Sequence, residues 1–107
     1  MDAQPIGTQF FSGEYNASVV QVIDPSKNIN GAVLRTANFV GTQYSILATG
    51  STPVTSATDK TKPVVLATSG SRYNTLNFPV ALPPGFGLWI ATFTGSSSLF
   101  LTYDLLP

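Results

Sequence analysis

Apolar residues occur along this chain in short runs, and none of these runs has the length and period of an amphipathic helix. The runs are rich in Val, Ile, Thr, Phe and Tyr, and Gly, Pro, Asn, Asp and Ser separate them at fairly even intervals. Such a pattern is typical of short antiparallel strands in a sandwich or barrel. We expect strands at residues 8–13, 17–24, 32–41, 44–50, 62–70, 73–82, 87–95 and 97–106. The predicted fold is therefore all-β: an antiparallel β-sandwich, jelly-roll-like, with about eight short strands and no significant helix.

Three further features divide the chain. Pro79 indicates a sheet edge or a bulge within residues 73–82, because a central strand would lose a ladder hydrogen bond there. Residues 51–61 are polar, small and rich in Thr, which predicts a surface loop. Residues 1–9 have weak structure of their own and are expected to form an N-terminal arm. Residues 10–107 are then a single β-sandwich domain, since this length supports one core.

Both faces of the last expected hairpin carry large apolar side chains. In strand 87–95, Trp89 and Phe93 share one face, while Leu88 and Ile90 share the other. The last strand alternates in the same way. A sheet with one solvated face would not need this pattern. Either these strands are central and covered on both sides, or one of their faces contacts another subunit.

Charge is scarce in this chain. Charged residues make up 9% of the sequence, against about 25% in typical soluble domains. The formal net charge is zero, which removes the repulsion that usually discourages association. Binding to a phosphate backbone requires clustered basic residues, and the five here are dispersed, so we expect no nucleic-acid partner. No apolar run approaches the roughly 20 residues that span a bilayer, so we also expect no membrane partner.

Catalytic and metal chemistry has few candidate residues. The chain contains no cysteine and no histidine, which excludes disulfides, thiolate metal sites and imidazole acid–base catalysis. Its carboxylates are isolated in sequence, whereas a glycosidase needs two that face each other. Folding could still unite two of them, such as Glu14 and Asp104. Lys60 and Lys62 lie in a polar loop, where they make poor general bases. We therefore predict no catalytic residue, no metal site and no cofactor, and hence not an enzyme.

The single tryptophan allows two interpretations. An exposed aromatic ring can serve as a platform for a sugar or a base. Such platforms usually combine two or three aromatic residues on exposed loops, whereas Trp89 lies between Leu88 and Ile90 in an apolar strand. We therefore expect Trp89 to pack in a core or an interface.

The C-terminal third resembles a family of small bacteriophage virion proteins. The stretch "FPVALPPGFGLWIA", a short Gly/Ser turn and the final "LFLTYDLL" carry the resemblance, within residues 73–106. Members of that family are head decoration or cement proteins and related tail accessory proteins. The resemblance implies a non-enzymatic structural protein that binds the outer capsid shell and stabilises it. It implies a homo-oligomer, with a trimer favoured over a dimer, that binds the major capsid protein or another virion protein. It also implies a final location in the virion. The start "MDAQPIG" lacks the basic and apolar regions of a secretory signal, so we expect synthesis in the host cytoplasm without secretion.

Candidate contacts with a subunit or with the capsid follow from the apolar faces and from the arm at residues 1–9. They are Phe10, Phe11, Leu88, Ile90, Phe100 and Leu106. One alternative is a carbohydrate- or receptor-binding module of a phage tail, in which Trp89, Tyr73 or Tyr103 contacts a glycan. A second alternative is an enzyme of the carboxylate type, which would need two acids in one cleft.

Overall fold

The computed structural model describes residues 5–15, 19–41, 44–69, 73–93 and 95–107. Within these residues the chain is all-β, as predicted, apart from one short 3-10 turn, η1 (Pro25–Lys27). The strands are β1 (Gln9–Tyr15), β2 (Val19–Ile23), β3 (Ala32–Gly41), β4 (Ser45–Gly50), β5 (Val64–Thr68), β6 (Tyr73–Thr75), β7 (Val80–Leu82), β8 (Gly87–Thr92) and β9 (Ser97–Leu105).

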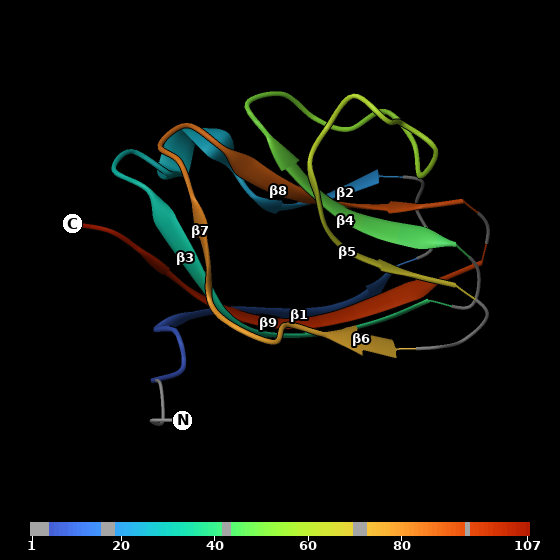
Figure 1. Cartoon of the computed structure of the whole chain (residues 1–107), viewed down its shortest axis with the longest axis horizontal. Coiled ribbons are helices and arrows are strands. Elements are labelled where there is room, and N and C mark those ends of the chain that lie inside the picture. The colour runs from blue at the N-terminus through green and yellow to red at the C-terminus, as the bar shows by residue number, and fades with distance from the viewer. Residues whose placement is uncertain (1–4, 16–18, 42–43, 70–72, 94) are drawn as a thin grey trace.

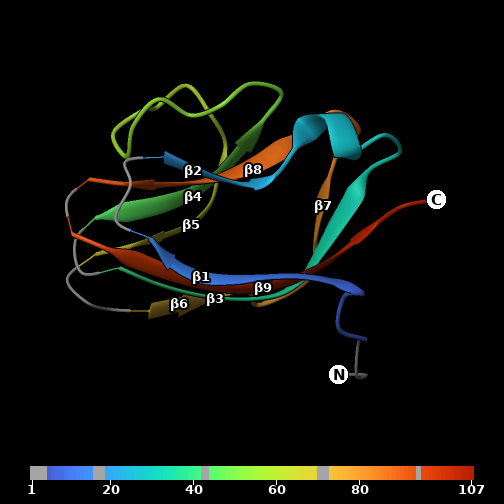
Figure 2. The same ribbon diagram turned by 180° about the vertical axis from the view of Figure 1, so that it is seen from behind.

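The strands form two antiparallel sheets that face each other as a sandwich (Figures 1 and 2). One sheet has the order β1-β9-β3-β6, with β7 also paired to β3, and the other has the order β2-β8-β4-β5. Because β6 and β7 pair with the two ends of β3, they act as one interrupted strand. Counted in that way, the described residues form eight strands in the order of a jelly roll, with the first strand beside the last. The predicted fold class is confirmed.

The strand expected over residues 73–82 is wrong as a continuous element. The structure divides it into β6 and β7, and Pro79 lies in the gap between them. There the Leu76 N–H donates to the Ala37 carbonyl oxygen at 3.3 Å, after which the chain leaves the ladder. Proline has no N–H to donate, so pairing with β3 resumes only at Val80. The sheet edge that Pro79 indicated for this segment is confirmed, because β6 lies at the end of its sheet.

The main core fills the space between the two sheets. Its largest fully buried side chains include Phe39 of β3, Ile90 of β8 and Leu99 of β9. Alternate residues of each strand point to this layer, as the pleat of a strand requires. Leu88 and Ile90 both have an exposed fraction of 0%.

A second apolar cluster lies on the outer face of the β2-β8-β4-β5 sheet. Residues 51–63, here called the capping loop, arch over this face in Figure 1. Val54 and Ala57 of the loop are 2% and 3% exposed and belong to the same cluster as Trp89, which is 2% exposed. The sequence predicts a surface loop at residues 51–61, but it does not predict that this loop packs on the sheet.

For strand β8, the sequence allowed either cover on both faces within the chain or contact of one face with another subunit. The structure shows that β8 is central and covered on both sides.

Asp59 holds the capping loop in shape. Its carboxylate accepts hydrogen bonds from the backbone N–H and hydroxyl groups of Thr61 and Thr55, at 2.5–3.1 Å. The Thr61 hydroxyl and backbone N–H, followed by the Thr55 backbone N–H, lower the pKa of Asp59 far below its ordinary value. The loop thus has its own polar network as well as two apolar anchors.

Asn28 joins the turn after η1 to the turn between β7 and β8. Its side-chain amide donates to the carbonyl oxygens of Pro83 and Phe86 at 2.8 and 2.9 Å. Its side-chain oxygen accepts from the Gly31 N–H at 2.8 Å. The residue is 2% exposed, so these three bonds replace water for a buried amide.

The N-terminal segment is attached to the last strand where it approaches β1. The Gly7 N–H donates to the Thr102 hydroxyl at 3.0 Å. The Thr8 N–H and hydroxyl donate to the Asp104 carboxylate at 2.8 and 2.9 Å, and Arg35 Nε lies 3.0 Å from the other oxygen of that carboxylate. The Thr8 N–H, followed by Arg35, lowers the pKa of Asp104. Of the arm expected at residues 1–9, residues 1–4 lie outside the described residues.

Candidate interaction surfaces

No described segment covers the outer face of the β1-β9-β3-β6 sheet, whereas the capping loop covers the outer face of the other sheet. The strand register arranges its side chains in three rows. The rows are Glu14–Ser98–Val40–Tyr73, then Ser12–Phe100–Asn38–Thr75, then Phe10–Thr102–Thr36. The Thr36 and Thr102 hydroxyl oxygens lie 2.7 Å apart, as expected for side chains on one face. We call this surface the aromatic face.

Three aromatic side chains of this face are largely exposed to solvent. Phe10 is 76% exposed, Tyr73 is 72% exposed and Phe100 is 60% exposed. Phe100 occupies the middle of the face, directly between Ser12 and Asn38 on the neighbouring strands. Phe10 and Phe100 are diagonal neighbours on adjacent strands, which places them within about 8 Å of each other. Aromatic side chains therefore project from a sheet face whose other residues in these rows are Ser, Thr, Asn and Val, with Glu14 at one corner.

Charged groups occur only at the corners of the aromatic face among the residues described. Glu14 lies at one end of β1, where the Ser98 hydroxyl donates to it at 3.3 Å. Arg35 and Asp104 form an ion pair at the opposite end of the sheet. A surface of this kind attracts neither sign of charge and suits apolar contact with another protein.

The structure separates the six expected contact residues into four groups. Phe10 and Phe100 are exposed on the aromatic face, and Phe11 is half-buried against the main core. Leu88 and Ile90 are wrong as contact residues, because both point between the sheets and have no exposed surface.

Leu106, the sixth candidate, lies apart from the aromatic face. It is 42% exposed, and its N–H donates to the carbonyl oxygen of Gly31. A Cβ atom added to Gly31 would lie 3.2 Å from the Leu106 side chain, so Leu106 rests against the turn before β3. The exposed part of Leu106 therefore lies beside the turn that precedes β3, away from the aromatic face.

The aromatic residues considered for glycan contact are not equivalent. Trp89 is buried beneath the capping loop and cannot serve as a platform. Tyr103 packs against the main core, and burial raises the pKa of its hydroxyl. Tyr73 is the exposed member of the three.

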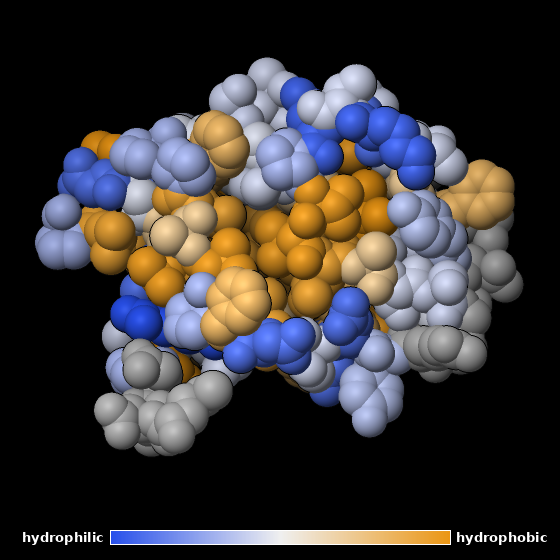
Figure 3. All heavy atoms as spheres, viewed as in Figure 1, coloured by the Kyte–Doolittle hydropathy of each residue, from blue (hydrophilic) through white to orange (hydrophobic). Residues whose placement is uncertain are grey.

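A second apolar surface lies along the sandwich edge formed by β5 and β7. In Figure 3, hydrophobic side chains gather in a band between the two sheets on the face toward the viewer. Half-buried side chains of β5, β7 and the adjoining segments pack there against the main core; they are Val65, Leu76, Val80 and Phe86. We call this surface the apolar seam.

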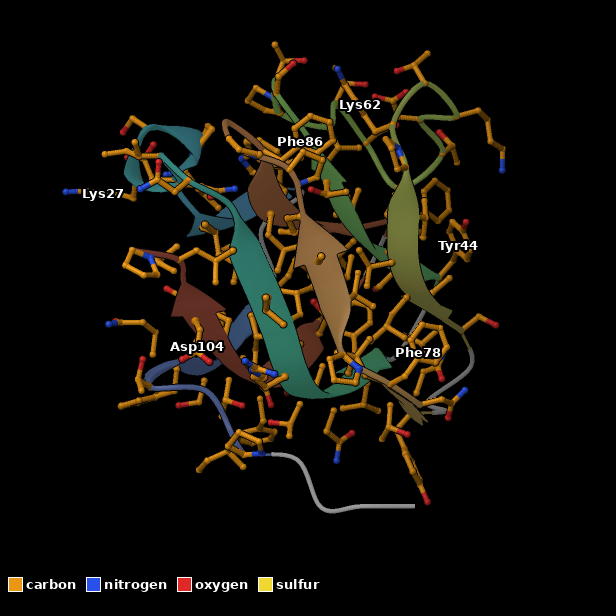
Figure 4. All side chains as sticks on the ribbon, turned by 60° about the vertical axis from the view of Figure 1, so that its left-hand side comes forward. Lys27, Tyr44, Lys62, Phe78, Phe86 and Asp104 are labelled. Carbon is orange, nitrogen blue, oxygen red and sulfur yellow. The ribbon has the colours of Figure 1, made fainter. Side chains whose placement is uncertain are left out.

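The ends of the apolar seam are defined by two phenylalanines and one hydrogen bond. Figure 4 places Phe86 near the top of β7 and Phe78 toward the lower end of β5. Phe78 is 69% exposed. The Asn74 side chain donates to the Ala67 carbonyl oxygen at 3.1 Å, which links β6 to β5 and closes that end. Sequence reasoning missed this surface because it places Phe78 within a continuous strand over residues 73–82 and Phe86 beside the turn that follows.

The carboxylates do not assemble into a catalytic pair in the described part of the chain. Glu14 pairs in register with Ser98, and Asp104 lies six residues further along β9. The rise of a strand then separates these two acids by about 20 Å. Asp24 is engaged locally, because it accepts hydrogen bonds from the N–H and hydroxyl of Ser26, which lower its pKa. Among the described residues, no three metal-ligating side chains lie together.

Comparisons with known proteins add no family to this description. No protein-family model matches the chain. A search of curated proteins finds no significantly similar sequence. Within the described residues, the structure contains no helix of the length and apolarity required to cross a membrane.

Proposed function

We propose that this chain is a non-enzymatic structural protein of a bacteriophage particle, a decoration protein that binds and stabilises the outer capsid shell through its aromatic face. The observation that carries the proposal is a sheet face with three exposed aromatic side chains and with charged groups only at its corners, among the residues described. The jelly-roll fold supports it, since viral capsid and lectin domains often use this architecture. The resemblance of residues 73–106 to small virion proteins supports it as well.

The energetics of the aromatic face favour attachment by several copies. Complete burial of a phenylalanine side chain contributes about 1.5–3 kcal/mol. Phe10 and Phe100 are 76% and 60% exposed, so covering both would contribute roughly 2–4 kcal/mol. Loss of translational and rotational freedom costs about 4 kcal/mol or more for each association. We therefore propose that the chain acts as a homo-oligomer, because linked copies bind a repeating shell more tightly than one copy does.

Cosedimentation with purified capsids of the phage whose genome encodes the chain tests this function. We expect the wild-type chain to sediment with the capsids and to raise the temperature at which they release their contents. A Phe10→Ser/Phe100→Ser double variant should remain in the supernatant. The matched control is Phe78→Ser, which removes an equally exposed phenylalanine from the apolar seam and should leave binding unchanged. A wild-type chain that does not bind, or a double variant that binds equally well, would contradict the proposal.

A glycan-binding module of a phage tail is the second candidate function. The observation that favours it is the position of Phe100 between Ser12 and Asn38, since sugar sites combine an aromatic ring with hydroxyl and amide partners. A glycan-array signal that is lost in Phe100→Ala and retained in Phe78→Ala would support this candidate. The absence of any glycan signal from the wild-type chain would exclude it.

A further inference from the structure

The two open edges of the sandwich differ in how well they are protected against pairing with another strand. At one edge, Pro63 and Pro79 immediately precede β5 and β7, and Pro83 follows β7. Prolines are a common means of blocking edge pairing, because they remove a donor from the ladder. At the other edge lies β1, whose sequence QFFSGEY contains no proline, lysine or arginine. Figure 2 brings this second edge to the front.

Strand β1 is long and regular for an unprotected edge. It pairs over seven residues with β9, without a bulge, and no described strand pairs with its other side. In an antiparallel ladder, every second residue of an edge strand directs its N–H and C=O groups outward, where they can pair with another chain. Phe10 lies on this strand and is 76% exposed.

The neighbouring edge strand, β2, offers less to a partner. It is shorter than β1, and its register with β8 shifts between Gln21 and Ile23. Val20 and Val22 already pack against the main core, so pairing would bury little additional apolar surface. The observations therefore point to β1.

We propose that β1 pairs with β1 of a second copy of this chain, antiparallel, about a two-fold axis perpendicular to the sheet. Antiparallel pairing of identical strands is the isologous contact that such an axis generates. If all seven residues of the two strands overlap, Ser12 lies opposite Ser12 of the second copy. Phe10 then lies opposite Glu14 of the second copy, so no two like charges face each other. The zero net charge of the chain also leaves no general repulsion to overcome.

This arrangement explains how two copies would act together on one surface. Directly opposed residues of antiparallel strands point to the same side of a sheet, so the aromatic faces of both copies lie on one side. The dimer presents Phe10 and Phe100 twice on a single continuous sheet, which supplies the multiple attachment that one copy lacks. The inference replaces the trimer implied by the family resemblance. It depends on β1 alone and does not require the proposed capsid partner.

Cysteine cross-linking tests the geometry directly, because the chain contains no cysteine of its own. Opposed residues in antiparallel strands have Cβ atoms about 4.5–5.5 Å apart. We expect Ser12→Cys to form a disulfide-linked dimer under mild oxidation, and a reducing agent to dissociate it. The matched control is Thr75→Cys, which is exposed on the same face but lies on β6 at the opposite end of the sheet. It should remain a single chain on a non-reducing gel.

Native mass by light scattering provides the second readout. We expect the wild-type chain to show twice the mass of one chain, and Ser12→Lys to show the mass of one chain, because two ammonium groups would face each other at the axis. Thr75→Lys should remain a dimer. The proposal is overturned by a monomeric wild-type chain at all concentrations, by equal cross-linking of Ser12→Cys and Thr75→Cys, or by efficient cross-linking of Gln21→Cys on β2 instead.

These outcomes are distinguishable from failure of the proposed function. A monomer that still sediments with capsids would refute β1 pairing and leave attachment standing. A β1-linked dimer that does not bind capsids would support β1 pairing and refute the proposed capsid attachment.

Discussion

Replacing Ile90 and Phe100 separately with lysine should produce two different defects, although both residues are large and apolar and lie in neighbouring segments of the chain. Ile90 is 0% exposed between the two sheets, and Phe100 is 60% exposed on the aromatic face. We expect Ile90→Lys to abolish the fold. We expect Phe100→Lys to fold and to lose attachment through the aromatic face.

The magnitudes follow from these exposed fractions. Burying an isoleucine contributes about 1.5–3 kcal/mol, and an unpaired ammonium group in a core costs several kcal/mol more. The total for Ile90→Lys approaches or exceeds about 5 kcal/mol, the lower end of the stability of a natural domain. Phe100 has 60% of its surface exposed already, so its loss removes about 1 kcal/mol of burial.

Urea unfolding followed by Trp89 fluorescence measures both effects, since this single tryptophan is buried beneath the capping loop. A loss of about 1 kcal/mol lowers the unfolding midpoint by roughly 0.5 M for a domain of this size. We therefore expect a small shift for Phe100→Lys and no cooperative transition for Ile90→Lys. A cooperative transition near the wild-type midpoint for Ile90→Lys would refute the placement of β8. A loss of about 3 kcal/mol or more for Phe100→Lys would refute the exposure of the aromatic face.

Two other substitutions test the polar contacts of the fold. Asn28→Ala removes the three hydrogen bonds of the buried amide, two to carbonyl oxygens and one from the Gly31 N–H, and should lower the free energy of unfolding by about 3 kcal/mol. The exposed neighbour variant Asn30→Ala should change it by less than about 0.5 kcal/mol, and equal losses in urea titrations would contradict the role of Asn28. The pKa of Asp104 is lower in the folded chain than its ordinary value of 3.8, because it accepts the Thr8 N–H and contacts Arg35. The resulting stabilisation is complete above pH 3.8 and is lost as the pH falls through the lower folded-state pKa. Thermal melts at about pH 6 and about pH 3 should therefore show a smaller acid loss for Asp104→Asn than for the wild-type chain, and equal losses would rule out this contribution.

The strand pattern could be predicted from sequence because turn residues and alternating apolar positions are local signals. Residues 32–41, for example, are predicted and observed as one strand. The interruption of residues 73–82 was only partly predictable. Pro79 indicates a defect, but the length of the gap depends on how β3 continues its pairing on the other side.

The choice of exposed face could not be predicted from the sequence. Strand β8 and strand β9 both carry apolar residues on both faces, yet a loop covers the outer face of β8 and solvent contacts the outer face of β9. The cover comes from Val54 and Ala57, two apolar residues within a polar segment. Periodicity describes which residues share a face, and it contains no information about the distant segment that packs on that face.

Asn28 illustrates the same limit for polar residues. Its three partners lie in a nearby turn and in the turn between β7 and β8, more than fifty residues away. In the sequence, it is one of several asparagines in turn regions, and no local signal distinguishes it from Asn30.

The capping loop makes the two outer faces of the sandwich different. It covers the outer face of one sheet, and no described segment covers the aromatic face of the other. A copy that binds a surface through its aromatic face therefore has only one orientation. The exposed residues Thr58 and Lys60 belong to this loop, which lies on the side of the molecule opposite the aromatic face. A group attached to the Lys60 side chain would be displayed outward on every copy, while Val54 and Ala57 hold the loop on the sheet below it. The same packing that hides Trp89 therefore makes this fold a directional platform for display.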